Sequence, residues 1–326
     1  MPLSDTLLQQ TRIRFPSLES AQVKITPIEK GGSERKFYRI QFSPGQSIVL
    51  VKYTGEHSEN ERYVEIAEFL AAHAIHAPKI YFHDPAEGLI WLEDLGERDL
   101  WSYREESWLV RRAFYESALE EIAKLHGVSA AASSAIRRDL PAQFDAELYL
   151  WEQHYFFSNC LGRHFGVAEE KLRALAELPA LREIADRLAS FPRVLVHRDF
   201  QSQNIIVRDR AAYLIDFQGM RPGLAEYDLA SLLYDPYVCL TTNERRELQA
   251  FYCEEAKVTD PAFAEKLQLC AMQRLMQALG AYAYLGLIRG NTAFLAHIPA
   301  ALQSLGQVVA GIDGLKPLRT WIETVS

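Results

Sequence analysis

The segment from residue 194 to residue 217, VLVHRDFQSQNIIVRDRAAYLIDF, constrains the fold of this chain more than any other. Short runs rich in β-branched and apolar residues alternate with polar connections, a pattern that predicts three short strands. These runs are Val194 to Val196, Ile205 to Val207 and Tyr213 to Ile215. The polar residues Asp199, Asn204 and Asp216 follow or flank the runs. We therefore expect strands and the loop between them to hold these three side chains rigidly and exposed.

These three residue types meet the requirements of phosphoryl transfer. A hydroxyl that attacks the γ-phosphate of ATP needs a carboxylate to orient it and accept its proton, and Asp199 is the candidate base. Mg²⁺ takes oxygen ligands and keeps several waters, so Asn204 and Asp216 suffice as its protein ligands. His-Arg-Asp, four residues, Asn and then a distant Asp-Phe is the order of kinase catalytic and metal loops. The alternative is a solvated loop in which His197 is an ordinary core residue.

Two features expected of an ATP-binding lobe precede this segment. Gly31 and Gly32 lie between alternating apolar residues, which predicts a β-hairpin whose backbone N–H groups, with Ser33, can approach phosphate oxygens. A plain hairpin is the alternative. The run SIVLVKY then carries Lys52, at the place where a kinase has the lysine that binds the α- and β-phosphates. An exposed lysine at a strand end is the alternative there.

An acidic helix is predicted next, from about Glu59 to Ala74. Its expected buried stripe consists of Tyr63, Ile66, Ala67, Leu70 and Ala74. A second stripe carries Glu61, Glu65 and Glu68, one of which should pair with Lys52. Glu61 is favoured for this ion pair, followed by Glu65.

A strand from Leu89 to Leu92 leads into a connector that contains Gly96. In a kinase this segment is the hinge between the lobes, and the backbones of Glu93 and Leu95 would bind the adenine edge. Trp91 either closes the back of the adenine pocket or packs in the core.

The pattern changes near Gly96 from short β-rich segments with one helix to long helical periodicities, such as that from Lys171 to Leu188. A chain of 326 residues, 48% of them hydrophobic, can bury two cores. We expect an α+β fold with two lobes. Residues 1–95 form a small antiparallel sheet lobe that binds ATP, and residues 96–326 form a mainly helical lobe with the catalytic loop, the metal loop and the substrate pocket.

The net charge of −8 comes without a basic cluster, which argues against nucleic-acid or anionic membrane partners. The four cysteines are scattered without C-x-x-C spacing, as buried thiols of a reducing compartment would be. No signal peptide and no apolar run of membrane-spanning length is found. We expect a monomeric cytoplasmic enzyme that acts on a small molecule.

Several segments together resemble the aminoglycoside phosphotransferase family of small-molecule kinases, which has a bilobal protein-kinase-like fold. They are LEDLGERDL, LPAQFDAELYLWEQHYF, VHRDFQSQN and LIDFQGMRPGLAEYDLASLLYDPY. Within the family, the chain is similar to bacterial kinases of the N-acetylmuramate and N-acetylglucosamine anomeric type. The resemblance implies ATP-dependent phosphorylation of a sugar hydroxyl, with the anomeric hydroxyl as acceptor, Asp199 as base and Asn204 and Asp216 on magnesium.

Two departures from this group mark candidate substrate contacts. Gly219 stands where the sugar kinases often carry an acidic residue, and Gln201 stands where a histidine is common. Asp145 and Arg221 are further polar candidates, although surface charge is the alternative for both. Asp228 is expected to be structural, either as a helix cap or as an anchor of the catalytic loop through buried hydrogen bonds.

Only about ten residues separate Asp216 from Tyr227, too few for a long activation segment, so a protein substrate is not expected. Two other functions stay open at this point. One is an antibiotic-modifying kinase of the same fold, and the other is a catalytically silent nucleotide-binding module. The complete set of Lys52, Asp199, Asn204 and Asp216 argues against silence, because a module that only binds needs no base.

Overall fold

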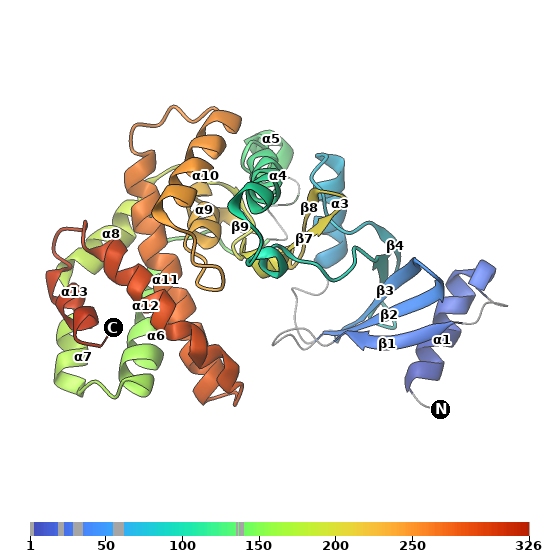
Figure 1. The fold of residues 1–326 in the computed structure, drawn as a ribbon, viewed down its shortest axis with the longest axis horizontal. Helices are drawn as coiled ribbons and strands as arrows, with labels where there is room; N and C mark the ends of the chain where they lie inside the picture. Colours follow the sequence, from blue (N-terminus) through green and yellow to red (C-terminus); the bar gives the residue numbers. More distant parts are fainter. Residues whose placement is uncertain are drawn as a thin grey trace.

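The computed structural model describes residues 3–18, 23–28, 35–54, 62–134, 136 and 140–325. A five-stranded antiparallel sheet occupies one end of the molecule (Figure 1). Its strands are β1 (Lys24–Ile28), β2 (Lys36–Ser43), β3 (Gln46–Lys52), β4 (Ile80–Asp84) and β5 (Leu89–Glu93), in the order β1-β2-β3-β5-β4. The N-terminal helix α1 (Leu3–Arg14) and helix α3 (Tyr63–Ala72) accompany the sheet.

The two faces of this sheet have different partners. Phe37 pairs with Val51 across β2 and β3, and this face packs into the main core with α3. Leu50 pairs with Trp91 across β3 and β5 on the other face, in a smaller core that includes Leu7 of α1. Trp91 is fully buried there and donates to Thr11 Oγ1 at 2.9 Å. Trp91 is therefore a core residue, and the alternative that it closes the adenine pocket is wrong.

Helix α3 confirms four positions of the predicted stripe and corrects the fifth. Tyr63, Ile66, Ala67 and Leu70 are buried. Ala74 lies beyond the helix at φ +54° and is exposed, while Ile75 N–H donates to Leu70 O at 3.0 Å. This is a Schellman-type ending, in which a left-handed residue turns the chain and the following apolar residue returns to the core. The predicted start at Glu59 lies outside the described residues.

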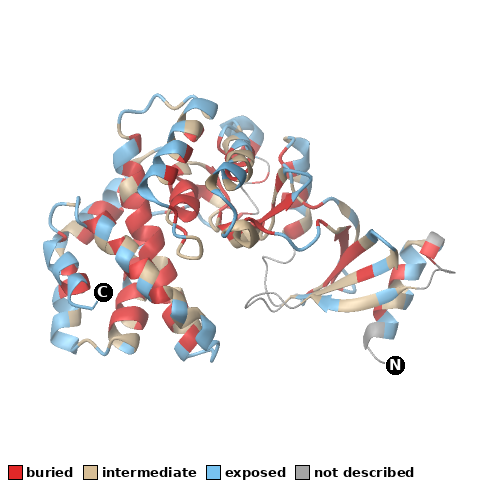
Figure 2. Cartoon of the chain, in the orientation of Figure 1, coloured by how far each residue is buried: buried red, intermediate tan, exposed pale blue. Residues whose placement is uncertain are grey.

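The remainder of the chain is mostly helical (Figures 1 and 2). Its helices are α4 (Trp108–His126), α5 (Ala130–Ser133), α6 (Ala146–Phe156), α7 (Glu169–Ala176), α8 (Pro179–Ser190), α9 (Ala225–Leu233), α10 (Thr242–Glu255), α11 (Phe263–Leu287), α12 (Ile298–Val309) and α13 (Lys316–Glu323). The 25-residue α11 contacts α6, α9 and α12 at the centre of this part. The single helix predicted from Lys171 to Leu188 is wrong, because Pro179 has no N–H and begins a new helix.

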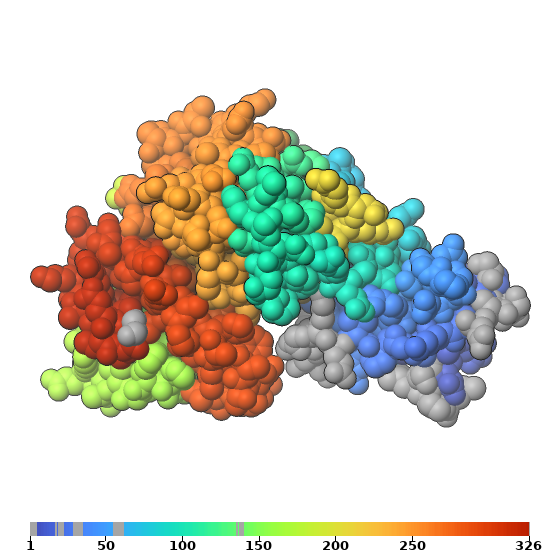
Figure 3. Space-filling model, in the orientation of Figure 1, coloured from blue at the N-terminus to red at the C-terminus, as the bar shows by residue number. Residues whose placement is uncertain are grey.

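Two small antiparallel sheets connect the parts. β6 (Val194–Val196) pairs with β9 (Arg221–Gly223), and β7 (Ile205–Arg208) pairs with β8 (Ala211–Leu214). The three predicted strands are confirmed with small changes of bounds, whereas β9 was not predicted. In the space-filling view the sheet part and the helical part adjoin through residues that follow β5 (Figure 3). Among the described residues, no helix is both long and apolar enough to span a membrane.

Candidate active site

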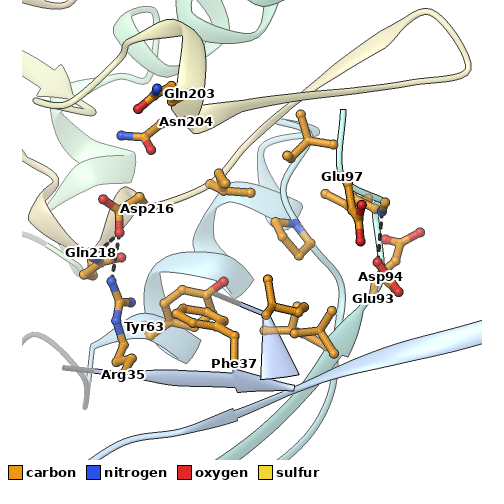
Figure 4. A pocket seen from close by; sticks show the side chains of 18 of the residues that line it. Arg35, Phe37, Tyr63, Glu93, Asp94, Glu97, Gln203, Asn204, Asp216 and Gln218 are labelled. Carbon is orange, nitrogen blue, oxygen red and sulfur yellow. Dashed lines mark hydrogen bonds and ion pairs between the residues drawn. The ribbon is translucent and has the colours of Figure 1, made fainter. Parts of the chain in front are cut away.

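A cavity of about 500 Å³ lies between the large sheet and the small strands (Figure 4). Its apolar walls are formed by Ile28, Phe37, Val49, Pro78, Leu92, Ile206 and Ile215. Its polar end brings together three residues predicted from the sequence, Asp199, Asn204 and Asp216. Two further predictions, Glu93 and Leu95, line the opposite end. An apolar slot with polar groups at both ends suits a nucleotide.

Asp228 anchors the loop that carries Asp199. Its carboxylate, which is fully buried on α9, accepts the N–H of His197 at 2.7 Å and the N–H of Arg198 at 2.8 Å. Arg198 adopts a left-handed conformation at φ +80°, which is uncommon for a side chain of this size. The two buried hydrogen bonds hold this turn and direct the next residue, Asp199, into the cavity. The predicted anchoring role of Asp228 is confirmed.

The residues predicted to bind metal lie on the adjoining loops. Asn204 Nδ2 donates to the backbone oxygen of Asp199 at 2.9 Å, which directs the amide oxygen of Asn204 away from that contact. Asp216 is left-handed at φ +62°, and its Oδ1 accepts from Gln218 Nε2 at 2.7 Å. Gln218 Oε1 is buried without a hydrogen-bond partner among the described residues. These oxygen atoms fit a hard cation such as Mg²⁺ that also binds phosphate oxygens.

Arginines surround the candidate base. Arg274 Nη2 of α11 lies 3.5 Å from Asp199 Oδ1, and Arg198 Nη1 lies 3.7 Å from Asp199 Oδ2. Burial raises the pKa of the Asp199 carboxyl, but the charges of Arg198, Arg274, His197 and Arg221 outweigh it and the net pKa is lowered. Asp199 is therefore ionised at neutral pH, as a base must be.

A second buried carboxylate lies behind this cluster. Glu152 of α6 is 2% exposed, and its Oε1 accepts the Tyr227 hydroxyl at 2.6 Å. Its Oε2 has no hydrogen-bond partner among the described residues. Burial raises the pKa of Glu152 to about 7, against the lowering effects of the Tyr227 hydrogen bond and of nearby arginines.

The predicted hinge segment lies at the end of the cavity opposite Asp216 (Figure 4). The Glu93 N–H donates to Lys79 O, just before β4, at 2.8 Å, and the Glu93 side chain pairs with Arg208 at 2.8 Å. Beyond the strand, Asp94 accepts from Gly96 N–H at 2.9 Å, which tightens the turn around Leu95. Leu95 lines the cavity, and the predicted contact of its backbone and that of Glu93 with adenine stays a prediction.

Lys52 does not reach this cavity. It is paired with Leu89 and shares a sheet face with Leu50 and Trp91, opposite the cavity face. It forms no ion pair with a described residue, and both Glu65 and Glu68 are exposed on α3. The favoured partner, Glu61, lies outside the described residues, and so do Gly31, Gly32 and Ser33, so their predicted roles stay predictions.

One of the four substrate candidates lines the cavity, two lie close to Asp199, and one lies apart from both. Gly219 lines the cavity, and a Cβ there would lie 3.3 Å from Arg198 Nη1 and 3.9 Å from Asp199 Oδ2. Arg221 is near Asp199 and donates through Nε to Gly219 O at 3.3 Å. Gln201 is placed in the turn after Asp199, where its N–H donates to Asp199 O. The exposed Asp145 caps α6 through Leu148 N–H at 2.8 Å and does not line the cavity.

Two charged residues of the site were missed from the sequence. Arg274 lies on α11, far along the chain, and nothing local distinguishes it from other helical arginines. Arg35 lines the cavity, and its Nη2 lies 2.8 Å from Asp216 Oδ1. The available signal was that Arg35, just before β2, alternates with Phe37 and Arg39 of that strand.

Comparison with known proteins agrees with this geometry. The sequence model of the phosphotransferase enzyme family (APH) matches residues 24–267. An N-acetylmuramate/N-acetylglucosamine kinase of Pseudomonas aeruginosa is 25% identical, covering 90% of this chain and 86% of its own length. A kinase of the same name from Caulobacter vibrioides is 27% identical, covering 81% and 74%.

Solved structures share the fold. ADP-bound aminoglycoside phosphotransferase APH(2'')-Ib superposes with a TM-score of 0.61 at 14% identity, covering 91% of this chain and 98% of its own. A choline/ethanolamine kinase family protein from Mesorhizobium loti has a TM-score of 0.64 at 16% identity, covering 96% and 99%. The predicted protein-kinase-like fold is confirmed. The chain belongs to the phosphotransferase enzyme family, and it is a kinase that uses ATP with Mg²⁺ to phosphorylate a hydroxyl acceptor.

Proposed function

We propose that this enzyme transfers the γ-phosphate of ATP to the anomeric hydroxyl of an amino sugar of the N-acetylmuramate and N-acetylglucosamine type. The observation that carries the proposal is the convergence of Asp199, Asn204 and Asp216 at one end of a nucleotide-sized cavity. The names of the curated relatives support the choice of acceptor.

The chain's own residues have separate tasks in this reaction. Asp199, kept ionised by Arg198 and Arg274, orients the acceptor hydroxyl and takes its proton as the new bond forms. Asn204 and Asp216 would hold Mg²⁺, which would neutralise charge on the phosphate oxygens of ATP, the donor of the phosphoryl group. Ile206 and Ile215 form part of the apolar wall that keeps water from the nucleotide base.

The charges near Asp199 favour an amino sugar over an aminoglycoside. Arg198, Arg221 and Arg274 all influence the pKa of the base, so the surroundings of the acceptor are rich in positive charge. A polycationic antibiotic would be repelled there, whereas the carboxylate of N-acetylmuramate would be attracted. Of the four substrate candidates, Arg221 is the one we propose for that carboxylate, because it forms no ion pair with a described residue.

A panel assay tests the acceptor. ADP release is measured with Mg²⁺-ATP and N-acetylmuramate, N-acetylglucosamine, glucose or kanamycin, for the natural enzyme, Asp199→Asn and the exposed control Asp313→Asn. We expect turnover with the two amino sugars, unchanged in the control and lowered about 10²- to 10⁴-fold in Asp199→Asn. Turnover with kanamycin alone would contradict the proposal. NMR of the product locates the phosphate, and a phosphate on C6 would contradict the anomeric assignment.

We further propose that residues 1–95 form the nucleotide lobe and residues 96–326 the acceptor lobe, in a cytoplasmic monomer without nucleic-acid partners. The net charge of −8 without a basic cluster supports the absence of a nucleic-acid partner. Sedimentation of the purified enzyme with and without duplex DNA tests the monomeric state and the absence of a nucleic-acid partner. A dimer, or a shift of sedimentation with DNA, would contradict them.

A further inference from the structure

The motif order assigns phosphate binding to Lys52, but the sheet places this lysine on the wrong face. Side chains alternate along β3, so Lys52 lies with Ile48 and Leu50 against the smaller core. Its cross-strand partners are Lys36 of β2 and Leu89 of β5. The strand pairing on both sides fixes this register, because a shift of one residue would exchange the faces of β3 and move Val49 and Val51 out of the main core into the smaller one.

Arg35 has the position that Lys52 lacks. It directly precedes β2 and lies two residues from Phe37, on the face that lines the cavity. Its side chain is 9% exposed and extends from the sheet to Asp216, where Nη2 lies 2.8 Å from Oδ1 (Figure 4). Asn204 lies on the far side of Asp216 in the same view. The guanidinium of Arg35 is therefore at the end of the cavity where the phosphates of a nucleotide must lie.

Aromatic rings fix this guanidinium in place. Its carbon Cζ lies 5.7 Å from the ring centre of Phe37 and 5.9 Å from that of Tyr63. Tyr63 in turn stacks on Phe217 at 4.7 Å, next to Asp216 in the chain. Planar guanidinium groups stack well on aromatic rings, so Arg35 is held ready at this place rather than swinging in solvent.

The other arginine of this sheet face is committed elsewhere. Arg39 Nε lies 2.6 Å from Asp94 Oδ2 and Arg39 also pairs with Glu97, at the hinge end of the cavity. Among the described residues, the acidic partner of Arg35 is by contrast a carboxylate proposed to bind Mg²⁺. With Mg²⁺ bound, Asp216 would share its negative charge with the cation, and the forked guanidinium, now 2.8 Å from Asp216, could donate to phosphate oxygens.

We propose that Arg35, and not Lys52, is the cation that binds the phosphate chain of the nucleotide. This inference rests on the proposed function, because it takes Asp216 as the metal ligand of an ATP site. It concerns nucleotide binding alone and is independent of the identity of the acceptor.

Binding of adenosine and of Mg²⁺-ATP, measured by isothermal titration without any acceptor, tests this inference. The variants are Arg35→Met, Arg35→Lys and the matched control Lys52→Met. We expect Arg35→Met to weaken ATP binding at least tenfold and to change adenosine binding less than twofold. Arg35→Lys should retain part of the ATP affinity, and Lys52→Met should change it less than threefold.

Two outcomes would overturn the inference. One is that Lys52→Met weakens ATP binding as much as Arg35→Met or more, which would restore the lysine to its motif role. The other is that Arg35→Met weakens adenosine and ATP equally, which would make Arg35 a packing residue. If ATP affinity depends on Arg35 but no amino sugar is phosphorylated, the inference stands and the proposed acceptor fails.

Discussion

Replacement of Glu152 by glutamine should change how the stability of this enzyme depends on pH. The folded protein raises the pKa of Glu152 from 4.5 to about 7, mainly through burial. Between these two values the folded chain keeps a proton that the unfolded chain has released. The contribution of Glu152 to the free energy of unfolding therefore falls as pH rises through this window, and it is smallest above pH 7.

The size of the effect follows from the same shift. At about 1.4 kcal/mol per pKa unit, the change from 4.5 to about 7 corresponds to a total loss of about 3–4 kcal/mol, of which about 2–3 kcal/mol falls between pH 5 and pH 8. Glu152 is 2% exposed, so solvent does little to screen this cost. Glutamine keeps an acceptor for the Tyr227 hydroxyl and never ionises, so it avoids the loss. With an unfolding entropy of about 2 cal/mol/K per residue, a loss of about 2–3 kcal/mol is a shift of about 4 °C in Tm for a chain of this length.

The assay is thermal unfolding at pH 5 and pH 8 for the natural enzyme, Glu152→Gln and the exposed control Glu170→Gln. We expect the Tm of Glu152→Gln, relative to the natural enzyme, to rise by about 4 °C from pH 5 to pH 8, and the control to show no such rise. Burying the side-chain NH₂ of the new glutamine costs the same free energy at both pH values, so this cost cancels when the two Tm differences are compared. A Tm difference that is the same at both pH values would refute the reasoning, because it would mean that Glu152 does not titrate between the two states.

Two further substitutions test the anchor and the acceptor contact. Asp228→Asn replaces one of the two oxygens that accept the N–H groups of His197 and Arg198. We expect the free energy of unfolding in denaturant to fall by about 2–3 kcal/mol and kcat to fall at least tenfold. Unchanged stability together with unchanged kcat would contradict the anchoring role. Arg221→Gln should lower kcat/KM for N-acetylmuramate about tenfold more than for N-acetylglucosamine, because only the former carries a carboxylate. Equal losses with the two sugars would exclude a carboxylate contact.

The core of the site was predictable because its signals are local. Asp199, Asn204 and Asp216 lie at the ends of short strands that their own neighbours specify. Strand β9 escaped prediction because Pro222 and Gly223 are poor strand formers, and only pairing with β6 makes them a strand.

The position of Lys52 could not be judged from sequence for a different reason. Both faces of β3 are buried, so Ile48 to Val51 form one continuous apolar run without alternation. Such a run does not show whether Lys52, at its end, faces the cavity or the smaller core. The pairing of β3 with β2 and β5 decides this, and strand pairing is a long-range property. Arg274 is equally long-range, since α11 brings it to Asp199 from 75 positions along the chain.

The anchor at Asp228 makes the position of the base Asp199 independent of the side chains that contact the acceptor. The base is positioned from inside the helical core by a carboxylate that solvent, and hence any acceptor, cannot touch. His126 Nε2 of α4 lies 3.1 Å from the same carboxylate, so three segments are tied to one point. Side chains on the acceptor side can therefore be exchanged without moving Asp199. A scaffold of this design can acquire new acceptors by substitution at its surface while its chemical step stays intact.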